Sequence, residues 1–401
     1  MSKIEIPSIR FRGFDDAWEQ CKLSEIADKV TEKNAGLQYV ETFTNSAEFG
    51  IISQRDFFDH DIAKLGSLDG YYIVKNEDFV YNPRISTSAP VGPINRNKLG
   101  RTGVMSPLYT VFRPHDIDTT YLEYFFKCGY WHSFMNFNGD SGARSDRFSI
   151  KDNVFFQMPV PIPHIDEQRK IGELLTCLDH LITLHQRKFE KLTNVKKSML
   201  EKMFPQNGSC YPAVRFKGFT GPWEQHTFGD VFEEYSEKNR ADLSPLTIIQ
   251  GSGTIRRDKS ERALQYDKAN LSSYKVVNEG DFIVHLRSFE GGLEKANSQG
   301  IISPAYHTFH GEGVDSRFYY AYFRSKKFID TDLKPHVYGI RDGRSIDIEG
   351  MKTIGIPFTS YPEQKLIGDA IDTINTLITL QQRELEKLQS IKKSLLEKMF
   401  V

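Results

Sequence analysis

Two stretches of the chain carry apolar residues at alternating spacings of three and four, which is the pattern of a helix that buries one long seam. No Gly or Pro interrupts residues 173–204 or residues 369–400. Each stretch can therefore form an unbroken helix of about 32 residues, roughly 48 Å long at 1.5 Å per residue. The seam residues are Ile171, Leu175, Leu178, Ile182, Phe189 and Leu192 in the first helix, and Ile367, Ile371, Ile374, Ile378, Leu385 and Leu388 in the second.

A seam of this length is too long to be buried inside one domain of ordinary size, so the two helices are expected to pack against each other. Because each helix follows a globular segment, an antiparallel pair would place two globular domains at opposite ends of a spacer. Polar residues interrupt the seam at His185 and Lys196, and at Gln381 and Lys392. These residues either set the register of the pair or lie beside the seam in water, and the sequence leaves both interpretations open.

The segments before each helix contain short runs rich in β-branched and aromatic residues, which predict strands separated by turns. Residues 71–84 (YYIVKNEDFVYNPR) and residues 274–287 (YKVVNEGDFIVHLR) each predict a strand, a turn and a second strand. Strands combined with helices in this way indicate a mixed α/β (α+β) fold. We expect a domain at residues 1–163, a helix at 164–204, a second domain at 205–359 and a second helix at 360–401.

The chain contains an internal sequence repeat. Residues 7–34 and 212–239 share P-x-x-R-F-x-G-F-x-x-x-W-E-Q and a later E-K-N, with 11 of 28 positions identical. GVMSPLY at 103–109 matches GIISPAY at 300–306, and residues 167–204 match residues 363–400 at 21 of 38 positions. Residues 40–70 and 245–271 show no convincing match. Such a repeat predicts one architecture with two different recognition surfaces, although a duplication kept only for bulk is the alternative.

The composition is that of an ordinary soluble protein with two or three domains. Of 401 residues, 52 are Lys or Arg and 53 are Asp or Glu, so any basic surface must be local. No apolar stretch approaches a membrane span and the start lacks a secretory signal, so we expect a cytoplasmic protein without membrane contact. The four cysteines form no C-x-x-C pair, and neither a disulfide framework nor a zinc site is predicted.

Motifs for cofactor binding and catalysis are missing from the sequence. No GxGxxG follows a predicted strand and no GxxxxGK[ST] occurs, so no site for a nucleotide or a methyl donor is predicted. Asn82-Pro83-Arg84 lacks the second Pro and the aromatic residue of the amino-methyltransferase tetrapeptide, and we interpret it as a turn.

Metal-dependent chemistry is also disfavoured. His307 and His310 are three residues apart in a predicted strand, so their rings should point to opposite faces. Asp78 and Asp281 are not followed by the E-x-K that would complete a nuclease site. We therefore predict no metal site in this chain.

Basic side chains gather in the predicted loops, and several recur at matched positions of the two halves. Arg84 matches Arg287, and the G-x-R-x-x-R pattern at residues 142–147 recurs at residues 339–344. Arginine suits phosphate oxygens and the O6/N7 edge of guanine, whereas a surface salt bridge is the alternative role for any single residue. The candidates for nucleic-acid contact are Arg84, Arg96, Lys98, Arg101, Arg144 and Arg147 in the first half, and Arg256, Arg257, Lys259, Arg287, Arg341 and Arg344 in the second.

Together these features resemble the DNA-specificity subunit of type I restriction-modification systems. The resemblance rests on the duplicated R-F-x-G-F-x-x-x-W-E-Q opening, the D-F-[VI] strand motif, the G-x-x-S-P-x-Y element and the E-Q-x-x-I-G helix that closes each half. It covers almost the whole chain. It implies two mixed α/β target-recognition domains, residues 1–163 and 205–359, in a pseudo-two-fold arrangement and separated by an antiparallel coiled coil of two long helices.

The resemblance also implies a function. Each domain would read one part of a bipartite, non-palindromic site in double-stranded DNA, and the helices would fix the spacing and dock two modification subunits. The chain would have no active site and no cofactor, because S-adenosylmethionine, ATP and Mg would be bound by the modification and restriction subunits. A stand-alone DNA methyltransferase or nuclease, and a coiled-coil interaction scaffold, are the alternative functions.

Overall fold

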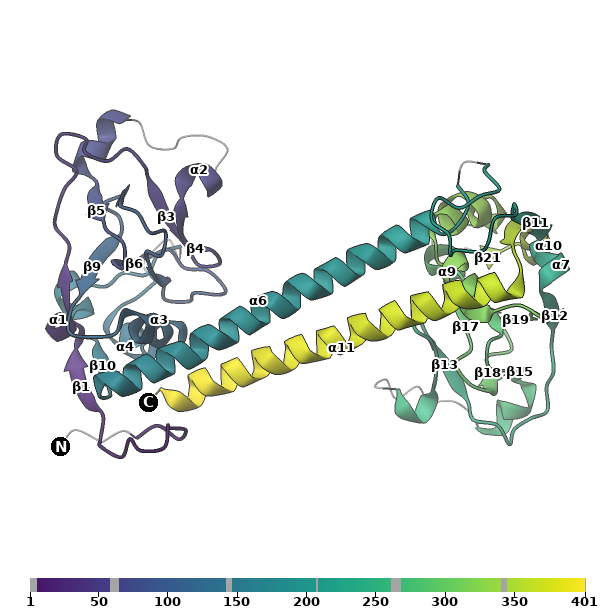
Figure 1. Ribbon diagram of the computed structural model, residues 1–401. Coiled ribbons are helices and arrows are strands. Elements are labelled where there is room, and N and C mark those ends of the chain that lie inside the picture. The colour runs from purple at the N-terminus through teal and green to yellow at the C-terminus, as the bar shows by residue number, and fades with distance from the viewer. Residues whose placement is uncertain are drawn as a thin grey trace. The chain divides into compact units, whose positions relative to one another are not determined.

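The computed structural model describes residues 6–57, 65–141, 146–206, 208–260, 268–339 and 345–400, and it divides into two compact units. Unit 1 comprises Met1–His185 and Glu384–Val401, and unit 2 comprises Gln186–Arg383. Each unit thus includes part of both long helices, whereas the sequence had led us to expect boundaries at the helix ends. Figure 1 labels the elements of both units.

The elements that precede and include the first long helix run from β1 to α6. They are β1 (Glu19–Lys22), α1 (Leu23–Ile26), β2 (Ala27–Lys29), β3 (Phe43–Ser46), β4 (Gly50–Ser53), α2 (Gln54–Phe57), η1 (Leu65–Gly70), β5 (Tyr72–Val74), β6 (Phe79–Tyr81), β7 (Ile94–Arg96), β8 (Gly103–Met105), β9 (Thr110–Pro114), α3 (Thr119–Lys127), α4 (His132–Asn138), α5 (Asp152–Phe155), β10 (Pro159–Ile162) and α6 (Ile165–Lys202).

The second half of the chain repeats this order with short additions. Its elements are β11 (Glu224–Thr227), α7 (Phe228–Val231), β12 (Glu233–Tyr235), β13 (Leu246–Ile249), β14 (Gly253–Arg256), η2 (Arg257–Lys259), η3 (Lys268–Ser273), β15 (Lys275–Val277), β16 (Phe282–Val284), α8 (Ser288–Gly291), β17 (Glu294–Lys295), β18 (Gly300–Ile302), β19 (His307–His310), α9 (Ser316–Phe323), η4 (Phe328–Leu333), η5 (Lys334–His336), β20 (Val337–Tyr338), β21 (Ser345–Ile346), α10 (Ile348–Lys352), β22 (Gly355–Phe358) and α11 (Tyr361–Met399).

The two units share one sheet topology. A four-stranded antiparallel sheet has the order β2-β9-β6-β7 in unit 1 and β12-β19-β16-β17 in unit 2. The pairs β1-β10 and β5-β8 correspond in the same way to β11-β22 and β15-β18. The prediction of a mixed α/β fold, and of one architecture used twice, is therefore confirmed.

The segments without a sequence match also share a structure. In unit 1, β3 and β4 form an antiparallel hairpin that pairs Phe43 with Ser53. In unit 2, β13 and β14 form a hairpin that pairs Leu246 with Arg256. Both hairpins have four-residue strands joined by three residues. The repeat in the fold therefore extends further than the repeat in the sequence.

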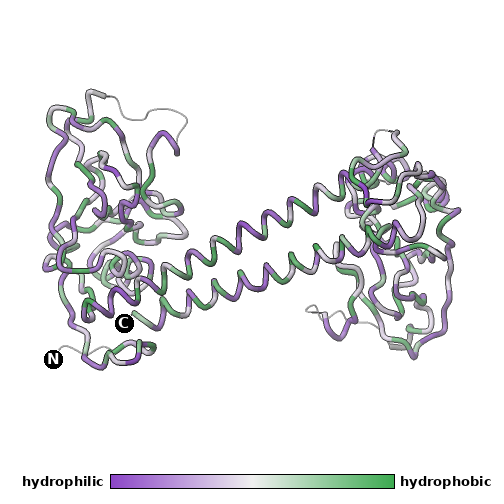
Figure 2. Tube along the Cα trace, in the orientation of Figure 1, coloured by the Kyte–Doolittle hydropathy of each residue, from purple (hydrophilic) through white to green (hydrophobic). Residues whose placement is uncertain are grey.

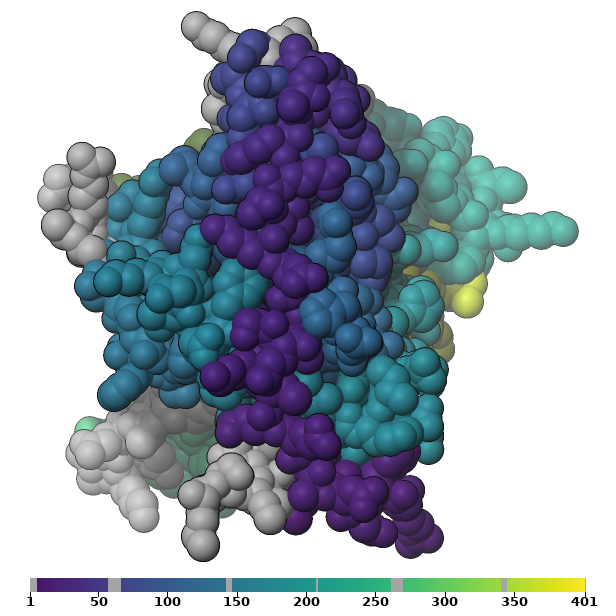
Figure 3. Space-filling view, turned by 90° about the vertical axis from the view of Figure 1, so that its left-hand side faces the viewer, coloured from purple at the N-terminus to yellow at the C-terminus, as the bar shows by residue number. Residues whose placement is uncertain are grey.

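The duplicated opening motif holds the first turn of the closing helix. Arg10 donates two hydrogen bonds to the carboxylate of Glu167 in α6, at 2.8 and 2.9 Å, and the Trp18 indole donates a third at 3.2 Å. Unit 2 repeats this clamp with the matched residues. Figure 3 shows the N-terminal segment as a purple band across the face of unit 1. The motif therefore joins the start of the domain to its last helix.

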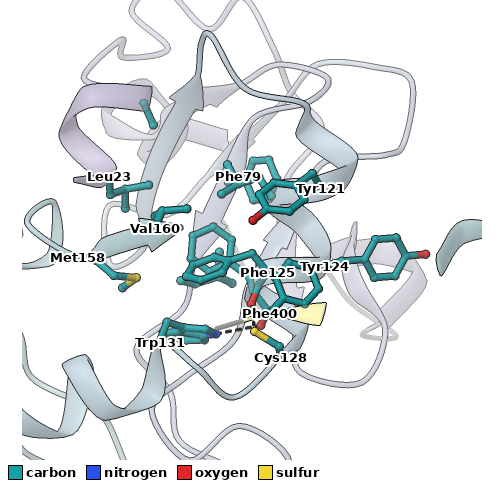
Figure 4. Packing of buried hydrophobic residues seen from close by; sticks show 14 of the residues in the cluster. Leu23, Phe79, Tyr121, Tyr124, Phe125, Cys128, Trp131, Met158, Val160 and Phe400 are labelled. Carbon is teal, nitrogen blue, oxygen red and sulfur yellow. Dashed lines mark hydrogen bonds between the residues drawn. The ribbon is translucent and has the colours of Figure 1, made fainter. Parts of the chain in front are cut away.

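Aromatic side chains dominate the core of unit 1. Trp131, Tyr121 and Phe125 are almost fully buried, and Figure 4 shows them in one cluster with Phe400. Tyr121 and Phe400 have ring centroids 5.4 Å apart. Burying such large side chains supplies most of the driving force for folding, at roughly 25 cal/mol per Å² of apolar surface removed from water. The end of α11 is thus part of the core of unit 1.

The long helices contribute their ends to both cores. Ile171, Leu175 and Leu178 of α6 lie in the core of unit 1, with Leu388 of α11 packed against it. Ile367 and Ile371 of α11 lie in the core of unit 2. Figure 2 shows the alternation of hydrophobic and hydrophilic residues along both helices. The remaining seam residues are half-buried: Ile182, Phe189, Leu192, Ile374, Ile378 and Leu385.

Three polar residues that interrupt the seam lie at packed positions rather than in water. Lys392 of α11 forms an ion pair with Asp179 of α6 at 2.5 Å within unit 1. Gln381 is buried in unit 2. Burial, and secondarily the charge of Arg324, lowers the pKa of Lys196. These contacts favour the interpretation that polar seam residues set the register of the helices. No helix in the described ranges is long and apolar enough to cross a membrane.

Candidate nucleic-acid interface

Arg84 and Arg147, which are far apart in the sequence, lie side by side in unit 1. Their backbones form an antiparallel bridge, and the N–H of Phe148 donates to the carbonyl of Pro83 at 2.7 Å. Partners in such a bridge have Cα atoms about 5 Å apart. Both arginines are exposed. The structure therefore brings two predicted contact residues onto one surface.

Arg287 of unit 2 follows a turn of the same design as Arg84. The backbone N–H of Arg84 donates to the side-chain oxygen of Asn82 at 3.0 Å. The N–H of Arg287 donates to Nδ1 of His285 at 3.3 Å. In both units a side chain two residues earlier thus accepts the arginine's N–H, and Arg287 is also exposed. The match that the sequence predicted between these arginines is a match in local geometry.

Three candidates of unit 1 are held in ion pairs. The side chain of Arg96 is only 8% exposed and its guanidinium is buried against the carboxylate of Glu123, at 2.6 Å. The prediction that Arg96 contacts a ligand is not supported, because its strand places it beneath α3. Lys98 also contacts Glu123, at 3.3 Å, and Arg101 contacts Glu41 at 2.7 Å, although both cations remain largely exposed.

The unit-2 candidates at the end of β14 and in η2 differ in their surroundings. Arg256 is exposed and paired with a neighbouring aspartate at 2.8 Å. Arg257 donates to the carbonyl of Leu246 at 3.2 Å and lies over the ring of Tyr274, so it supports the hairpin. Lys259 is exposed. The remaining candidates lie outside the described residues: Arg144, Arg341 and Arg344.

Each unit carries a cleft near the turn of Arg84 or Arg287, but the two clefts share only the tyrosine that ends the duplicated G-x-x-S-P-x-Y element. The unit-1 cleft, of about 390 Å³, is lined by residues that include Lys29, Tyr72, Pro83, Tyr109, Arg147 and Asp152. The unit-2 cleft, of about 790 Å³, is lined by residues that include Ile249, Gln250, Lys259, His285, Arg287 and Tyr306. Tyr109 and Tyr306 are the last residues of the duplicated G-x-x-S-P-x-Y element. These tyrosines are not among the residues that the sequence analysis predicted to contact nucleic acid. The repetition of the G-x-x-S-P-x-Y element was the signal that could have indicated them.

The charges in the two clefts are different. In unit 1, Lys29 is paired with Asp152, which leaves Arg147 as the main positive charge. In unit 2, Lys259 and Arg287 line the cleft, and its described lining residues include no carboxylate. Burial lowers the pKa of His285 to about 4, with help from nearby arginines, so the ring is neutral at pH 7. The unit-2 cleft is therefore the more attractive of the two for an anionic ligand.

A residue on the edge strand of each sheet holds the neighbouring hairpin, β3–β4 in unit 1 and β13–β14 in unit 2. In unit 1 this residue is Asn95, which pairs with Val80 in the sheet. Its amide donates to the side-chain oxygen of Asn45 at 2.7 Å and to the carbonyl of Ser46 at 3.1 Å. The β3–β4 hairpin is thus held by donated hydrogen bonds.

Glu294 occupies the corresponding register position in unit 2, opposite Ile283. Its fully buried carboxylate accepts hydrogen bonds from the backbone N–H groups of Gly251 and Gly253, at 2.7 and 3.1 Å, next to the tip of the β13–β14 hairpin. Arg324 neutralises this carboxylate through a contact at 2.5 Å. Unit 2 therefore holds its hairpin with the opposite hydrogen-bond polarity, which explains why sequence comparison missed the correspondence.

The residues considered for metal chemistry have structural partners. His307 shares a hydrogen bond with Glu234, and His310 shares one with Asp281, both at 2.7 Å. The two rings therefore form hydrogen bonds with different carboxylates. Asp78 is buried and bound by an arginine. The described residues contain no group of three or more His, Cys, Asp or Glu side chains arranged to hold a metal ion.

The sequence of this chain is similar to the sequences of known proteins. Residues 15–194 match the type I restriction modification DNA specificity domain. The chain is 24% identical over 267 residues to the type I restriction enzyme MjaVIII specificity subunit of Methanocaldococcus jannaschii, and 22% identical over 269 residues to a proposed MjaX specificity subunit of that organism. Each alignment covers 62% of this chain, and they span 62% and 60% of those relatives, less than two thirds of their length.

A solved structure shares the fold over the whole chain. The crystal structure of a type I restriction-modification system S subunit from M. genitalium aligns over 99% of both chains, with a TM-score of 0.57 and 11% identity. At that identity the likeness concerns the fold. Over residues 15–194 the chain is thus similar in sequence to the DNA-specificity domain of type I restriction-modification systems, and its fold is similar to that of a solved S subunit.

Proposed function

We propose that this chain is the sequence-specific DNA-recognition subunit of a type I restriction-modification complex and acts in the cytoplasm. Each unit reads one part of a bipartite, non-palindromic site in double-stranded DNA. The observation that supports this most directly is the turn shared by Arg84 and Arg287, which presents an exposed arginine at the same place in both units. Recurrence at matched positions favours one binding function used twice.

The differences between the units support two unlike half-sites. The corresponding hairpins β3–β4 and β13–β14 differ in sequence and in whether their anchors, Asn95 and Glu294, donate or accept hydrogen bonds. Side chains that contact base edges decide sequence preference, whereas arginines and lysines that contact phosphates contribute affinity. A shared scaffold with different hairpins therefore gives two different readings of DNA.

The long helices are proposed to set the interval between the half-sites and to dock two modification subunits. A helix of 38 residues, such as α6, is about 57 Å long, which exceeds one 34 Å turn of DNA. Several apolar side chains on the two helices remain exposed, as expected of a surface that binds a partner protein. These residues are Leu181, Leu184, Val195, Leu366, Leu377, Leu380 and Ile391.

Chemistry is assigned to the partner subunits. Modification subunits would bind S-adenosylmethionine and methylate adenine, and restriction subunits would use ATP and Mg for translocation and cleavage. The specificity subunit itself would supply binding and orientation, with no catalytic residue and no cofactor.

The test is to produce the chain together with its modification subunits and to map methylated adenines across the host genome. The proposal predicts methylation confined to one bipartite motif with unlike halves. Methylation without such a motif would contradict it. The isolated chain, incubated with DNA and either S-adenosylmethionine or Mg²⁺, should neither methylate nor cleave it, and turnover would favour a stand-alone enzyme.

A DNA-binding measurement separates recognition from a purely structural scaffold. The complex should bind DNA that contains its motif, and log K should fall linearly with log[salt] because phosphate contacts release counterions. A scaffold without DNA contacts would show no such dependence.

A further inference from the structure

Gln250 follows the last residue of β13, at the exposed tip of the hairpin and at the rim of the unit-2 cleft. Its side-chain amide makes no hydrogen bond with any residue in the described ranges. A primary amide carries two donor hydrogens and an acceptor oxygen. Among the described residues, none occupies the donors or the acceptor of the Gln250 amide, which can therefore bind a ligand.

The amide of Gln250 nevertheless has a defined position. A Cβ atom placed on Gly291 of α8 would lie 2.0 Å from Nε2 of Gln250, and its three nearest neighbours would all be atoms of that side chain. The amide thus lies against bare backbone, in space that exists because residue 291 is glycine. A side chain held in place before binding loses less conformational entropy when it binds.

The backbone next to Gln250 is fixed as well. Glu294 binds the N–H groups of Gly251 and Gly253, as described above. Tyr320, in α9, donates a hydrogen bond to the carboxylate of Glu294 at 2.7 Å. Arg324, directly after the end of α9, contacts the same carboxylate at 2.5 Å. A buried, fully hydrogen-bonded carboxylate therefore supports the hairpin from beneath, which is the arrangement expected behind a recognition residue.

The surroundings of Gln250 suit the major groove of DNA. The groove admits a two-stranded β-ribbon, and β13 and β14 form such a ribbon. Lys259 and Arg287 line the same cleft and can contact the phosphates on either side. The neutral amide of Gln250 lines this cleft together with the two cations, and base edges are the partners that suit a primary amide.

We propose that Gln250 is a specificity-determining residue that reads an adenine in the half-site bound by unit 2. Its amide would accept a hydrogen bond from N6 of the adenine and donate one to N7. The inference rests on the proposed function. Ala47 occupies the corresponding position in the unit-1 hairpin, so unit 1 does not read a base in this way.

The experiment maps the methylated motif of the complex with modification subunits for the wild type, Gln250→Ala, Gln250→Glu and Gly291→Ala. Gln250→Ala should relax one position of the unit-2 half-site, with discrimination against the wrong base falling roughly 5- to 150-fold. Gln250→Glu should shift the preference there from adenine toward cytosine, because a carboxylate accepts from N4 of cytosine.

Gly291→Ala tests the position of the amide rather than its presence. The three atoms nearest to the new methyl group all belong to the flexible side chain of Gln250, so the unit should fold while the amide is displaced. Discrimination should weaken at the same base pair, and the unit-1 half-site should stay unchanged. Gln299→Ala is the matched control, because Gln299 is an exposed glutamine of unit 2 that does not line the cleft.

The outcomes separate the inference from the proposed function. A wild-type motif with two halves, unchanged in both Gln250→Ala and Gly291→Ala, overturns the role of Gln250 and leaves the proposed function intact. Absence of any motif for the wild type overturns the proposed function itself. If Gln250→Ala fails to assemble with its partners, the base preference of Gln250→Glu and of Gly291→Ala decides the question.

Discussion

Glu363, in the first turn of α11, accepts two hydrogen bonds from the guanidinium of Arg215, at 2.6 and 2.8 Å. The Trp223 indole donates a third at 3.1 Å, and the carboxylate is fully buried. This is the unit-2 copy of the Arg10–Glu167 clamp. Because the Arg and Trp come from the duplicated opening motif and the Glu from the closing helix, the clamp connects the first and last segments of the repeat.

Removing the arginine of either clamp should destabilise its unit. Arg10→Ala leaves the buried carboxylate of Glu167 without its cation, and we expect the free energy of unfolding to fall by about 3 kcal/mol. Urea denaturation measures this loss. Arg12→Ala, two residues away and exposed, is the control and should change stability by less than about 0.5 kcal/mol. Equal effects of both variants would show that the clamp contributes nothing specific.

The unit-2 clamp predicts a dependence of stability on pH. Burial alone would raise the pKa of Glu363, but hydrogen bonds from Arg215 and Thr359 outweigh it and leave the pKa below its ordinary value of 4.5. The folded state therefore binds fewer protons than the unfolded state near this pH, so the clamp stabilises fully above pH 4.5. Its contribution is lost as the pH falls through the folded-state pKa.

Glu363→Gln tests this dependence by removing the titrating group. Urea denaturation of wild type and variant between pH 7 and pH 3 should give a difference in stability that shrinks as the pH falls below 4.5. A difference that stays constant over this range would mean that ionisation of Glu363 does not contribute.

The sequence predicted the elements that depend on a local pattern found in both halves of the chain. The seam residues Ile171 and Ile367 predicted the long helices, and the matched Arg84 and Arg287 proved to share a turn. In both cases a local pattern was sufficient, since helix periodicity and a two-residue turn do not depend on distant residues.

Features that depend on distant partners could not be predicted in this way. Arg96 was indistinguishable from a surface arginine until the fold placed it beside Glu123. Asn95 and Glu294 hold equivalent hairpins with opposite hydrogen-bond polarity, so no identity relates them. Tertiary contacts of this kind decide whether a charge is structural or available, and a sequence pattern does not contain them.

His285 should make the stability of unit 2 depend on pH in a second range. Burial, and then Arg324 and Arg287, lower the pKa of His285 to about 4 from its ordinary value of 6.5. Between pH 6.5 and pH 4 the histidine is protonated in the unfolded chain but remains neutral in the folded one. The free energy of unfolding therefore falls as the pH drops through this range.

His285→Asn provides the comparison, because asparagine stands at the matched position of unit 1 and accepts the same backbone N–H. The variant should lose less stability than the wild type between pH 6.5 and pH 4, measured by urea denaturation. Parallel pH profiles of the two proteins would contradict a buried neutral ring at residue 285.

The candidate interface predicts opposite behaviour for two arginines of unit 1. Arg84→Ala, in the complex with modification subunits, should weaken binding to the cognate duplex and reduce the slope of log K against log[salt] by about 0.9 if Arg84 contacts one phosphate. Stability should be nearly unchanged, since the side chain is exposed. Arg96→Ala should instead lower the free energy of unfolding by about 1–2 kcal/mol, because it removes a buried ion pair while Lys127 and Lys98 still contact Glu123. Its salt slope should equal that of the wild type wherever the variant is folded. Reversal of the two patterns would place the DNA on another face of unit 1.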